Sequence, residues 1–205
     1  MIKNYLEQLK IQRWDDHRYY HHSRINQSLH FVSALSFLIA YVMMVFDPLM
    51  SALIGWLVSM TSRQAGHFFF EPKGYDHVNQ ATHEHKEEIK VGYNIRRKIV
   101  LLAVWVALPA VLWFFPSLGG LIEPAVGIKA YLEDVGMAWF CLGAVGLLFR
   151  VGQLWATQGA MQGFAWMTKI LTDPFHDVYL YHKAPLYLLR GQLIDPMDHV
   201  GSQAH

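Results

Sequence analysis

The sequence predicts an all-α fold: a polytopic integral membrane helical bundle. Hydrophobic residues make up 53% of the 205 residues and charged residues only 16%, whereas about a quarter of the residues of an ordinary soluble domain are charged. The apolar residues are gathered into long runs that prolines, glycines and charged stretches separate. Each run approaches the roughly 20 residues that a helix needs to span a hydrocarbon core.

Four apolar runs are the expected transmembrane helices. The first run ends at Asp47-Pro48, which favours a turn because proline lacks a backbone donor and restricts the residue before it. The first two runs therefore form a helical hairpin, which either crosses the membrane or re-enters on the same side. The third run is closed by Pro116, and the fourth continues in less apolar form to residue 167. The four runs are residues 29–46, 49–70, 99–115 and 135–149.

The distribution of basic residues predicts the orientation of these helices. Five lysines and arginines precede the first run and six lie between the second and third runs, whereas the opposite side carries Lys129 alone. Because positive residues stay on the cytoplasmic side, both termini should be cytoplasmic. We expect a single membrane domain over residues 1–205, made of a cytoplasmic N-terminal segment (1–28), the hairpin (29–70), a His-rich cytoplasmic loop (71–98), the third and fourth spans (99–168) and a cytoplasmic tail (169–205).

Composition argues against nucleic-acid binding and against sites built from cysteines. The net charge is only +1 and the basic residues form no long stripe, so we expect no nucleic-acid partner. Cys141 is the single cysteine, which leaves no disulfide framework and no Cys-rich zinc site.

Within the polar segments we expect a helix over residues 79–98, and short helices in the tail after Thr172 because it contains three prolines.

Histidine is the residue type that stands out. The chain has 12 histidines, and none lies in the middle of an apolar run. The predicted topology places all of them on the cytoplasmic side, with His30 and His67 just inside that interface. A shared site explains this distribution, whereas scattered structural histidines do not.

The first histidine cluster surrounds the start of the first span. Asn26 and His30 follow His22 at successive steps of four, so these three side chains share one face if the stretch is helical; His21 precedes them. They are either metal ligands with their supporting residues or interfacial side chains satisfied by water and lipid headgroups.

The second cluster is His67 and Glu71, four residues apart at the end of the second run. Gly66 would allow the backbone of a neighbouring segment to approach closely. The pair fits a metal ligand with a supporting carboxylate, or two ligands, and it also fits an ordinary helix-end pair.

The remaining histidines are weaker candidates. His77, His83 and His85 lie among acidic residues, and His83 and His85 point to different faces of a helix, so at most one of them should join a given metal. His176 and His182 fit metal binding and plain surface positions equally, whereas His199 and His205 at the end should lie outside the site.

Histidine-rich sites without thiolates indicate iron as the first choice of metal, with one or two Fe(2+) ions and O2 as the co-substrate. Zinc is the second choice, because the same ligands could hold an activated water. An apolar shell around such a site suits a lipid or fatty-acid substrate.

Two motifs resemble one known family. The spacing H-H-x-x-x-N-x-x-x-H in YYHHSRINQSLHF, followed one hairpin later by G-H-x-x-F-E in RQAGHFFFE, resembles the membrane 2-hydroxy-fatty-acid dioxygenases of fungi and bacteria. The resemblance covers about Tyr19 to Glu71. It implies a small, multi-spanning, iron(II)-dependent enzyme of fatty acid α-oxidation, which shortens a 2-hydroxy fatty acid by one carbon with molecular oxygen.

The chain also departs from that family. After Glu71 the family pattern has a basic pair and Pro-Ala, whereas this chain has PKGYDH. The additional histidines look more like the membrane di-iron hydroxylases and desaturases, although the H-x-x-H-H boxes of those enzymes are missing here.

These observations lead to one hypothesis with three alternatives. His22, His30 and His67 would hold iron, joined by His83 or His85 and with His77 as a further candidate, while His21, Asn26 and Glu71 would assist catalysis. Arg63, Arg96 and Arg97 could hold an anionic headgroup. The alternatives are a di-iron lipid hydroxylase or desaturase, a zinc-dependent membrane hydrolase and a non-catalytic metal-binding membrane protein.

Overall fold

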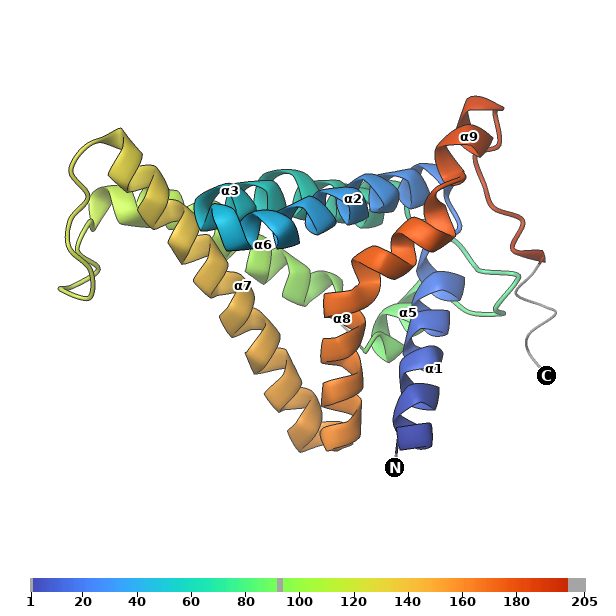
Figure 1. Cartoon of the computed structure of the whole chain (residues 1–205). Coiled ribbons are helices and arrows are strands. Elements are labelled where there is room, and N and C mark those ends of the chain that lie inside the picture. The colour runs from blue at the N-terminus through green and yellow to red at the C-terminus, as the bar shows by residue number, and fades with distance from the viewer. Residues whose placement is uncertain (1, 92–93, 199–205) are drawn as a thin grey trace.

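The computed structural model describes residues 2–91 and 94–198, and this part of the chain is helical, with no strand (Figure 1). Among these described residues two isolated β-bridges form, one between Ser23 and Ile194 and one between Asp76 and Ala81. The helices are α1 (Ile2–Tyr20), α2 (Arg24–Phe46), α3 (Pro48–Leu53), η1 (Ile54–Met60), α4 (Thr61–Ala65), η2 (Gly66–Phe70), α5 (His83–Ile89), α6 (Ile95–Phe114), α7 (Ile128–Gln158), α8 (Ala160–Tyr181) and α9 (Ala184–Leu189).

The hairpin predicted around Asp47-Pro48 is formed. Helix α2 ends at Phe46, and the Asp47 side chain accepts a hydrogen bond from the Met50 backbone N–H at 2.9 Å, which caps the next helix. The returning segment, Pro48–Phe70, is a succession of four short helical elements that run alongside α2 in Figure 1. Two of them, η1 and η2, are π-helical, a wide form that is frequent at functional sites.

In the part of the chain that the structure describes, three helices, α2, α6 and α7, are long and apolar enough to span a membrane. The second predicted span, residues 49–70, is divided among the four short elements, so the count of four spans is not confirmed. Helix α7 has 31 residues and is about 46 Å long at 1.5 Å per residue. It therefore extends well beyond the predicted run 135–149 and beyond a hydrocarbon core of about 30 Å.

A tryptophan cluster joins the hairpin to α6 and α7. Trp56 donates from Nε1 to the Trp139 carbonyl at 2.8 Å, and Trp139 donates to the Trp105 carbonyl at 3.0 Å. The Trp56 and Trp105 rings stack with their centroids 5.8 Å apart. Trp56 and Trp139 therefore combine apolar surroundings with a satisfied indole N–H, and these contacts fix the hairpin against the later helices.

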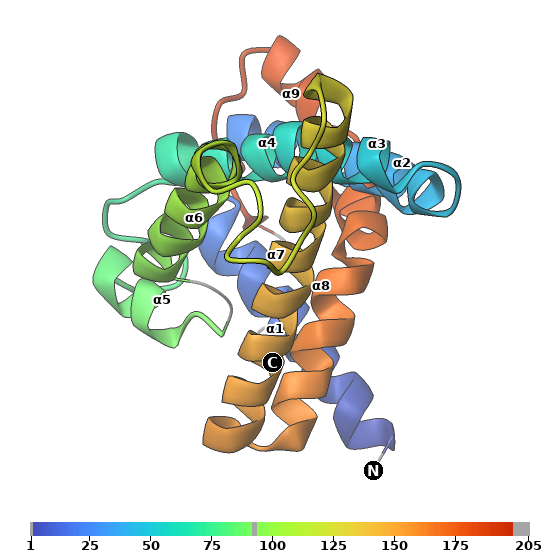
Figure 2. The ribbon, with the colours of Figure 1, turned by 90° about the vertical axis from the view of Figure 1, so that its left-hand side faces the viewer.

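The polar helix α1 packs along α8, as Figures 1 and 2 show. Helix α8 follows α7 after a sharp turn at Gly159, whose φ of 95° suits glycine. The expectation of only short helices after Thr172 was wrong, because α8 continues through Pro174 to Tyr181. It leans over in its second half in Figure 1, as a helix does where a proline removes a backbone hydrogen bond. Of the helix expected over residues 79–98, the structure forms α5, while residues 95–98 belong to the start of α6.

Candidate metal centre

Three imidazoles from separate parts of the chain converge at one point. His21 lies directly after α1, His30 in α2 and His67 in η2. The Nε2 atom of His30 is 3.2 Å from Nε2 of His21 and 3.2 Å from Nε2 of His67, and the three atoms lie within 4.8 Å of one another. His21 and His30 are 1% and 0% exposed. We call His21, His30 and His67 the three-histidine cluster.

The polar side chains of α2 hold His21 in place. The Asn26 amide donates to the Tyr20 carbonyl at 2.9 Å, and the Gln27 amide donates to the His21 carbonyl at 2.7 Å. Because residues 21 and 22 lie in the link between two helices, these bonds set the direction of the His21 side chain. Asn26 therefore supports the cluster and is not one of its metal-binding residues.

An oxygen atom lies behind each imidazole. Nδ1 of His21 is 3.0 Å from the Asp16 carbonyl oxygen, Nδ1 of His67 is 2.8 Å from Glu71 Oε2, and Nδ1 of His30 is 3.5 Å from Asp177 Oδ2. Carbonyl and ionised carboxylate oxygens only accept hydrogen bonds. For His21 and His67, the hydrogen-bond distances to these oxygens favour the neutral tautomer with the proton on Nδ1. Asp177 lies behind His30 at an ion-pair distance without a hydrogen bond.

With their protons on Nδ1, His21 and His67 both direct an Nε2 lone pair at Nε2 of His30, which could donate a proton to only one of them. Lone pairs this close repel unless a cation lies among them. Two ligand nitrogens bound at about 2.1 Å to one metal are about 3.0–3.4 Å apart, which includes the observed 3.2 Å. Oxygen atoms behind the rings are also typical of metal-binding histidines, so the cluster fits a metal ion.

The carboxyl groups behind the rings differ in their environment. Burial favours the neutral acid at Asp177, but the Arg63 guanidinium, which pairs with it, and the neighbouring His30 hold the pKa of Asp177 below its usual value. Burial raises the pKa of Glu71 to about 7, against the opposing charges of Lys90 and Lys98. Glu71 can therefore exchange a proton near neutral pH, which is useful in acid–base chemistry.

A second group of potential ligands comprises Glu71, His83 and Glu87, whose ligand atoms also lie within 4.8 Å of one another. Lys90 lies 2.8 Å from Glu87 Oε1 and 3.9 Å from Glu71 Oε1. This ammonium already supplies a positive charge to both carboxylates. The group is thus less suited to a cation than the three-histidine cluster.

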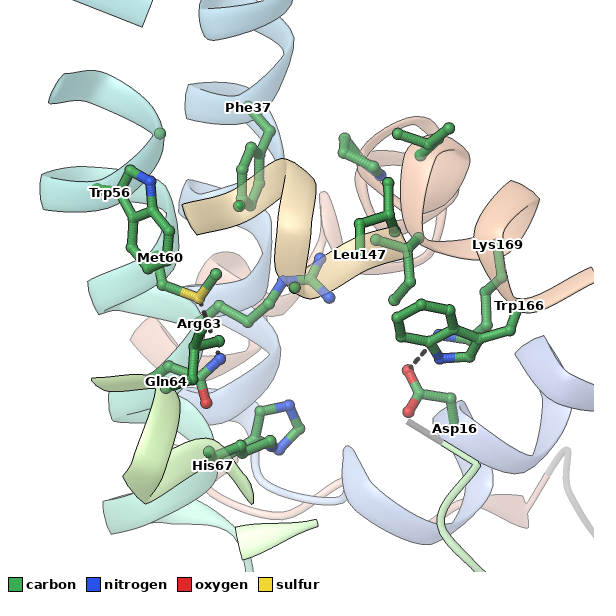
Figure 3. A pocket seen from close by; sticks show the side chains of 18 of the residues that line it. Asp16, Phe37, Trp56, Met60, Arg63, Gln64, His67, Leu147, Trp166 and Lys169 are labelled. Atoms are coloured by element: carbon green, nitrogen blue, oxygen red, sulfur yellow. Dashed lines mark hydrogen bonds and ion pairs between the residues drawn. The ribbon is translucent and has the colours of Figure 1, made fainter. Parts of the chain in front are cut away.

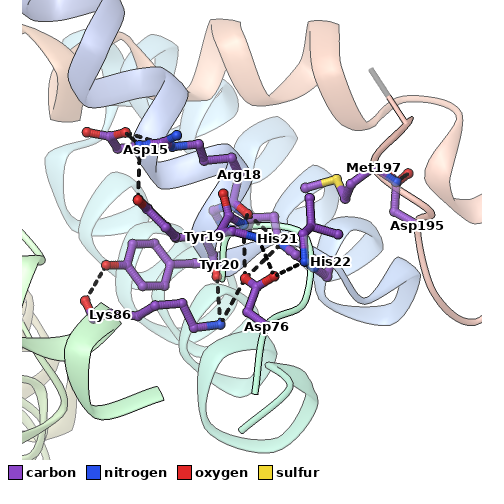
Figure 4. A network of polar contacts seen from close by, with 12 residues as sticks. Asp15, Arg18, Tyr19, Tyr20, His21, His22, Asp76, Lys86, Asp195 and Met197 are labelled. Atoms are coloured by element: carbon purple, nitrogen blue, oxygen red, sulfur yellow. Dashed lines mark hydrogen bonds and ion pairs between the residues drawn. The ribbon is translucent and has the colours of Figure 1, made fainter. Parts of the chain in front are cut away.

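His22 does not join the cluster, which corrects the set of ligands expected from the sequence. Its Nε2 donates to the Arg18 carbonyl and lies 3.6 Å from Asp76 Oδ2 (Figure 4). The expected spacing assumed one helix through His22, Asn26 and His30, but α2 begins only at Arg24. The break before it turns His21 inward and His22 towards the loop that carries Asp76.

The other candidate histidines lie away from the cluster. His77 is exposed and packs on the Tyr75 ring with centroids 5.0 Å apart, and His85 is also exposed. The sequence analysis expected His83 or His85 to join the cluster, but His83 belongs to the second group instead. His182 is exposed, and His176 shares no potential metal group with other described residues. His199 and His205 lie outside the described residues.

Helix α8 supplies residues that the sequence analysis missed. Tyr181 is 2% exposed, and its ring centroid is 5.4 Å from that of His21 and 6.1 Å from that of His30. Its hydroxyl is 3.0 Å from His17 Nδ1. Asp173, Asp177 and Tyr181 follow one another at steps of four, so the helical spacing of these polar residues was the signal that could have revealed them.

A cavity of about 550 Å³ lies beside the cluster, with His67 in its wall (Figure 3). This volume is within the usual range of about 300–1,000 Å³ for ligand sites. Apolar side chains form most of the lining, and charged groups are gathered near His67 and Asp16. The apolar part includes Phe37, Trp56, Met60, Phe140, Leu147 and Trp166, and the charged part includes Asp16, Arg63, Lys90, Lys98 and Lys169.

Comparisons with protein-family models, curated proteins and solved structures gave no match to this chain.

Gly66 allows the hairpin to approach Asn26. A Cβ at position 66 would overlap Asn26 Oδ1 and lie 3.2 Å from its Cγ. We expect Gly66→Ala to displace Asn26, lower the free energy of unfolding by about 1–3 kcal/mol and weaken metal binding. Thermal unfolding and metal content measure both effects.

Gly55→Ala is the matched control, because a Cβ at position 55 meets nothing within 4 Å. Gly55 also lies in the returning segment of the hairpin, so its replacement should be neutral or slightly stabilising. Equal behaviour of the two variants would show that the contact with Asn26 is unimportant.

Proposed function

We propose that this chain is a membrane-bound, non-haem iron oxygenase that acts on a fatty-acyl substrate, with a 2-hydroxy fatty acid as the best candidate. One observation carries the proposal: three neutral imidazoles direct their Nε2 atoms to one point beside an apolar cavity. The resemblance of the motifs around His21 and His67 to 2-hydroxy-fatty-acid dioxygenases supplies the reaction class.

Each residue of the site would have its own role. His21, His30 and His67 would hold the metal, which when bound would supply the redox chemistry with oxygen. Glu71, 2.8 Å from His67 Nδ1, would keep that imidazole in the Nδ1-protonated form, which raises the basicity of a ligand. Asp177 lies 3.5 Å behind His30.

The cavity would bind the acyl chain and exclude water. Its apolar wall includes Phe37, Trp56 and Phe140, while His67 lies in the wall at the charged part. Such a lining would place the chain among apolar side chains and the polar end of a substrate near the cluster. The same arrangement keeps water from the reacting atoms.

Membrane sidedness belongs to the same proposal. The basic residues before α2 and between η2 and α6 favour a cytoplasmic position for both termini and for the cluster. A substrate could then exchange with the cytoplasmic leaflet.

Oxygen consumption by protein purified without oxygen tests the proposal. After loading with Fe(II), addition of 2-hydroxyhexadecanoic acid should consume oxygen and yield an acid one carbon shorter. Hexadecanoic acid, which lacks the 2-hydroxyl, is the substrate control and should consume little. No oxygen uptake by iron-loaded protein with the hydroxy acid would contradict the proposal.

Zinc-dependent hydrolysis is the second candidate, favoured by the ligand set itself. Three histidines without a carboxylate are a usual set for catalytic zinc. Hydrolysis of acyl esters by the zinc-loaded protein, without oxygen uptake by the iron-loaded protein, would identify this function instead. Two metal ions per chain would point to the second group, Glu71, His83 and Glu87, and to the di-iron alternative.

A further inference from the structure

The basic residues that line the cavity differ in how they are paired. Four positive side chains line its charged part, and three of them have anionic or aromatic partners close by. Lys169 lies 3.1 Å from Asp16 and 2.7 Å from Asp173, Arg63 pairs with Asp177, and Lys90 lies 2.8 Å from Glu87 and 3.8 Å from the centroid of the Tyr20 ring.

Lys98 is the exception among these cavity residues. In the part of the chain that the structure describes, its ammonium has no hydrogen bond and no carboxylate oxygen within the 4.0 Å of an ion pair. Its side chain is only partly exposed. A cation removed from water without a partner is costly, so the position favours an anionic ligand.

The place of Lys98 relates it to the three-histidine cluster. Lys98 and His67 line the cavity together, and both also line a smaller pocket that contains Glu71. The apolar side of the cavity, with Trp56 and Phe37, offers room for a hydrocarbon chain. The unpaired ammonium therefore belongs to the charged part of an otherwise apolar cavity.

We propose that Lys98 binds the carboxylate of an acyl substrate and so selects free acids over esters. This inference rests on the proposed function and deepens it. A carboxylate held at Lys98 puts the adjoining carbon atoms, rather than the middle of the chain, near His67. Lys98 is then a positioning residue, and it explains why the second carbon of the acid would meet the metal site.

The test measures equilibrium binding without turnover. Full-length protein with its metal, purified without oxygen and placed in lipid nanodiscs, is titrated with radiolabelled 2-hydroxyhexadecanoic acid and with its methyl ester. The wild type, Lys98→Met, Lys98→Arg and the control Lys183→Met are compared. Lys183 is an exposed lysine near the end of the chain, so its replacement controls for a general loss of positive charge.

We expect the wild type and Lys183→Met to bind the acid about tenfold or more tightly than the ester, since a hydrogen bond to a charged group is worth that much. Lys98→Met should lose this preference while its affinity for the ester and its metal content stay unchanged. Lys98→Arg should recover most of the preference.

Two results would overturn the inference: equal binding of acid and ester by the wild type, or an unchanged preference for the acid in Lys98→Met. Oxygen uptake by the wild type in either case would leave the proposed function standing. If the preference for the acid depends on Lys98 but the protein consumes no oxygen, the proposed oxygenase activity is contradicted. The carboxylate-binding role of Lys98 would then still be supported.

Discussion

Replacement of His30 by alanine is expected to lower metal affinity by about a hundredfold or more, because even the loss of a supporting residue behind a ligand costs about 10- to 100-fold. His30 is central to the cluster, since its Nε2 contacts those of both His21 and His67. Activity that depends on the metal should be lost together with the metal. Metal content after purification measures the loss directly.

Thermal unfolding gives a second measure of the same variant. A ligand at about 1,000 times its dissociation constant stabilises the folded state by about 4 kcal/mol, so a chelator should lower the midpoint of the wild type. The midpoint of His30→Ala should not respond to the chelator. His85→Ala, in which an exposed imidazole is removed, should behave as the wild type. Full metal content in His30→Ala would exclude His30 as a ligand.

The second large effect is a contrast between two adjacent histidines. His21→Ala should lose metal and activity as His30→Ala does, since Nε2 of His21 faces the cluster. His22→Ala should keep its metal, because the His22 imidazole contacts the Arg18 carbonyl and Asp76 instead. Its expected cost is about 1 kcal/mol of folding stability for the lost hydrogen bond.

Metal content and the chelator-induced change in thermal unfolding, measured side by side, distinguish these variants. The pair is well matched, because both changes remove one imidazole from the same link between α1 and α2. Loss of metal from His22→Ala with retention in His21→Ala would contradict the structure and restore the ligand set expected from the sequence.

The helices that are long and apolar enough to span a membrane could be predicted, because apolar runs of this length are typical of membrane-spanning helices. The turn at Asp47-Pro48 was equally predictable, since both residues act locally. The π-helical elements η1 and η2 were not, because they depend on packing against α2 rather than on any residue pattern. Pro174 misled the prediction for the same reason: tertiary contacts keep α8 helical through it.

The site was predictable where two residues share one helical segment. Glu71 follows His67 by four residues, and the two side chains contact each other as that spacing indicates. The choice between His21 and His22 depended instead on where α2 begins, and helix ends are poorly defined by sequence. Asp177 and Tyr181 meet the cluster from a distant helix, which no local pattern could reveal.

The central claim is that one metal ion is held by three imidazoles, and X-ray absorption spectroscopy on protein loaded with Fe(II) tests it most directly. The account predicts the scattering pattern of three histidine ligands on one iron per chain, falling to two in His21→Ala protein forced to bind iron at high concentration. A wild-type spectrum without histidine ligands, or protein that retains no metal at all, would contradict it.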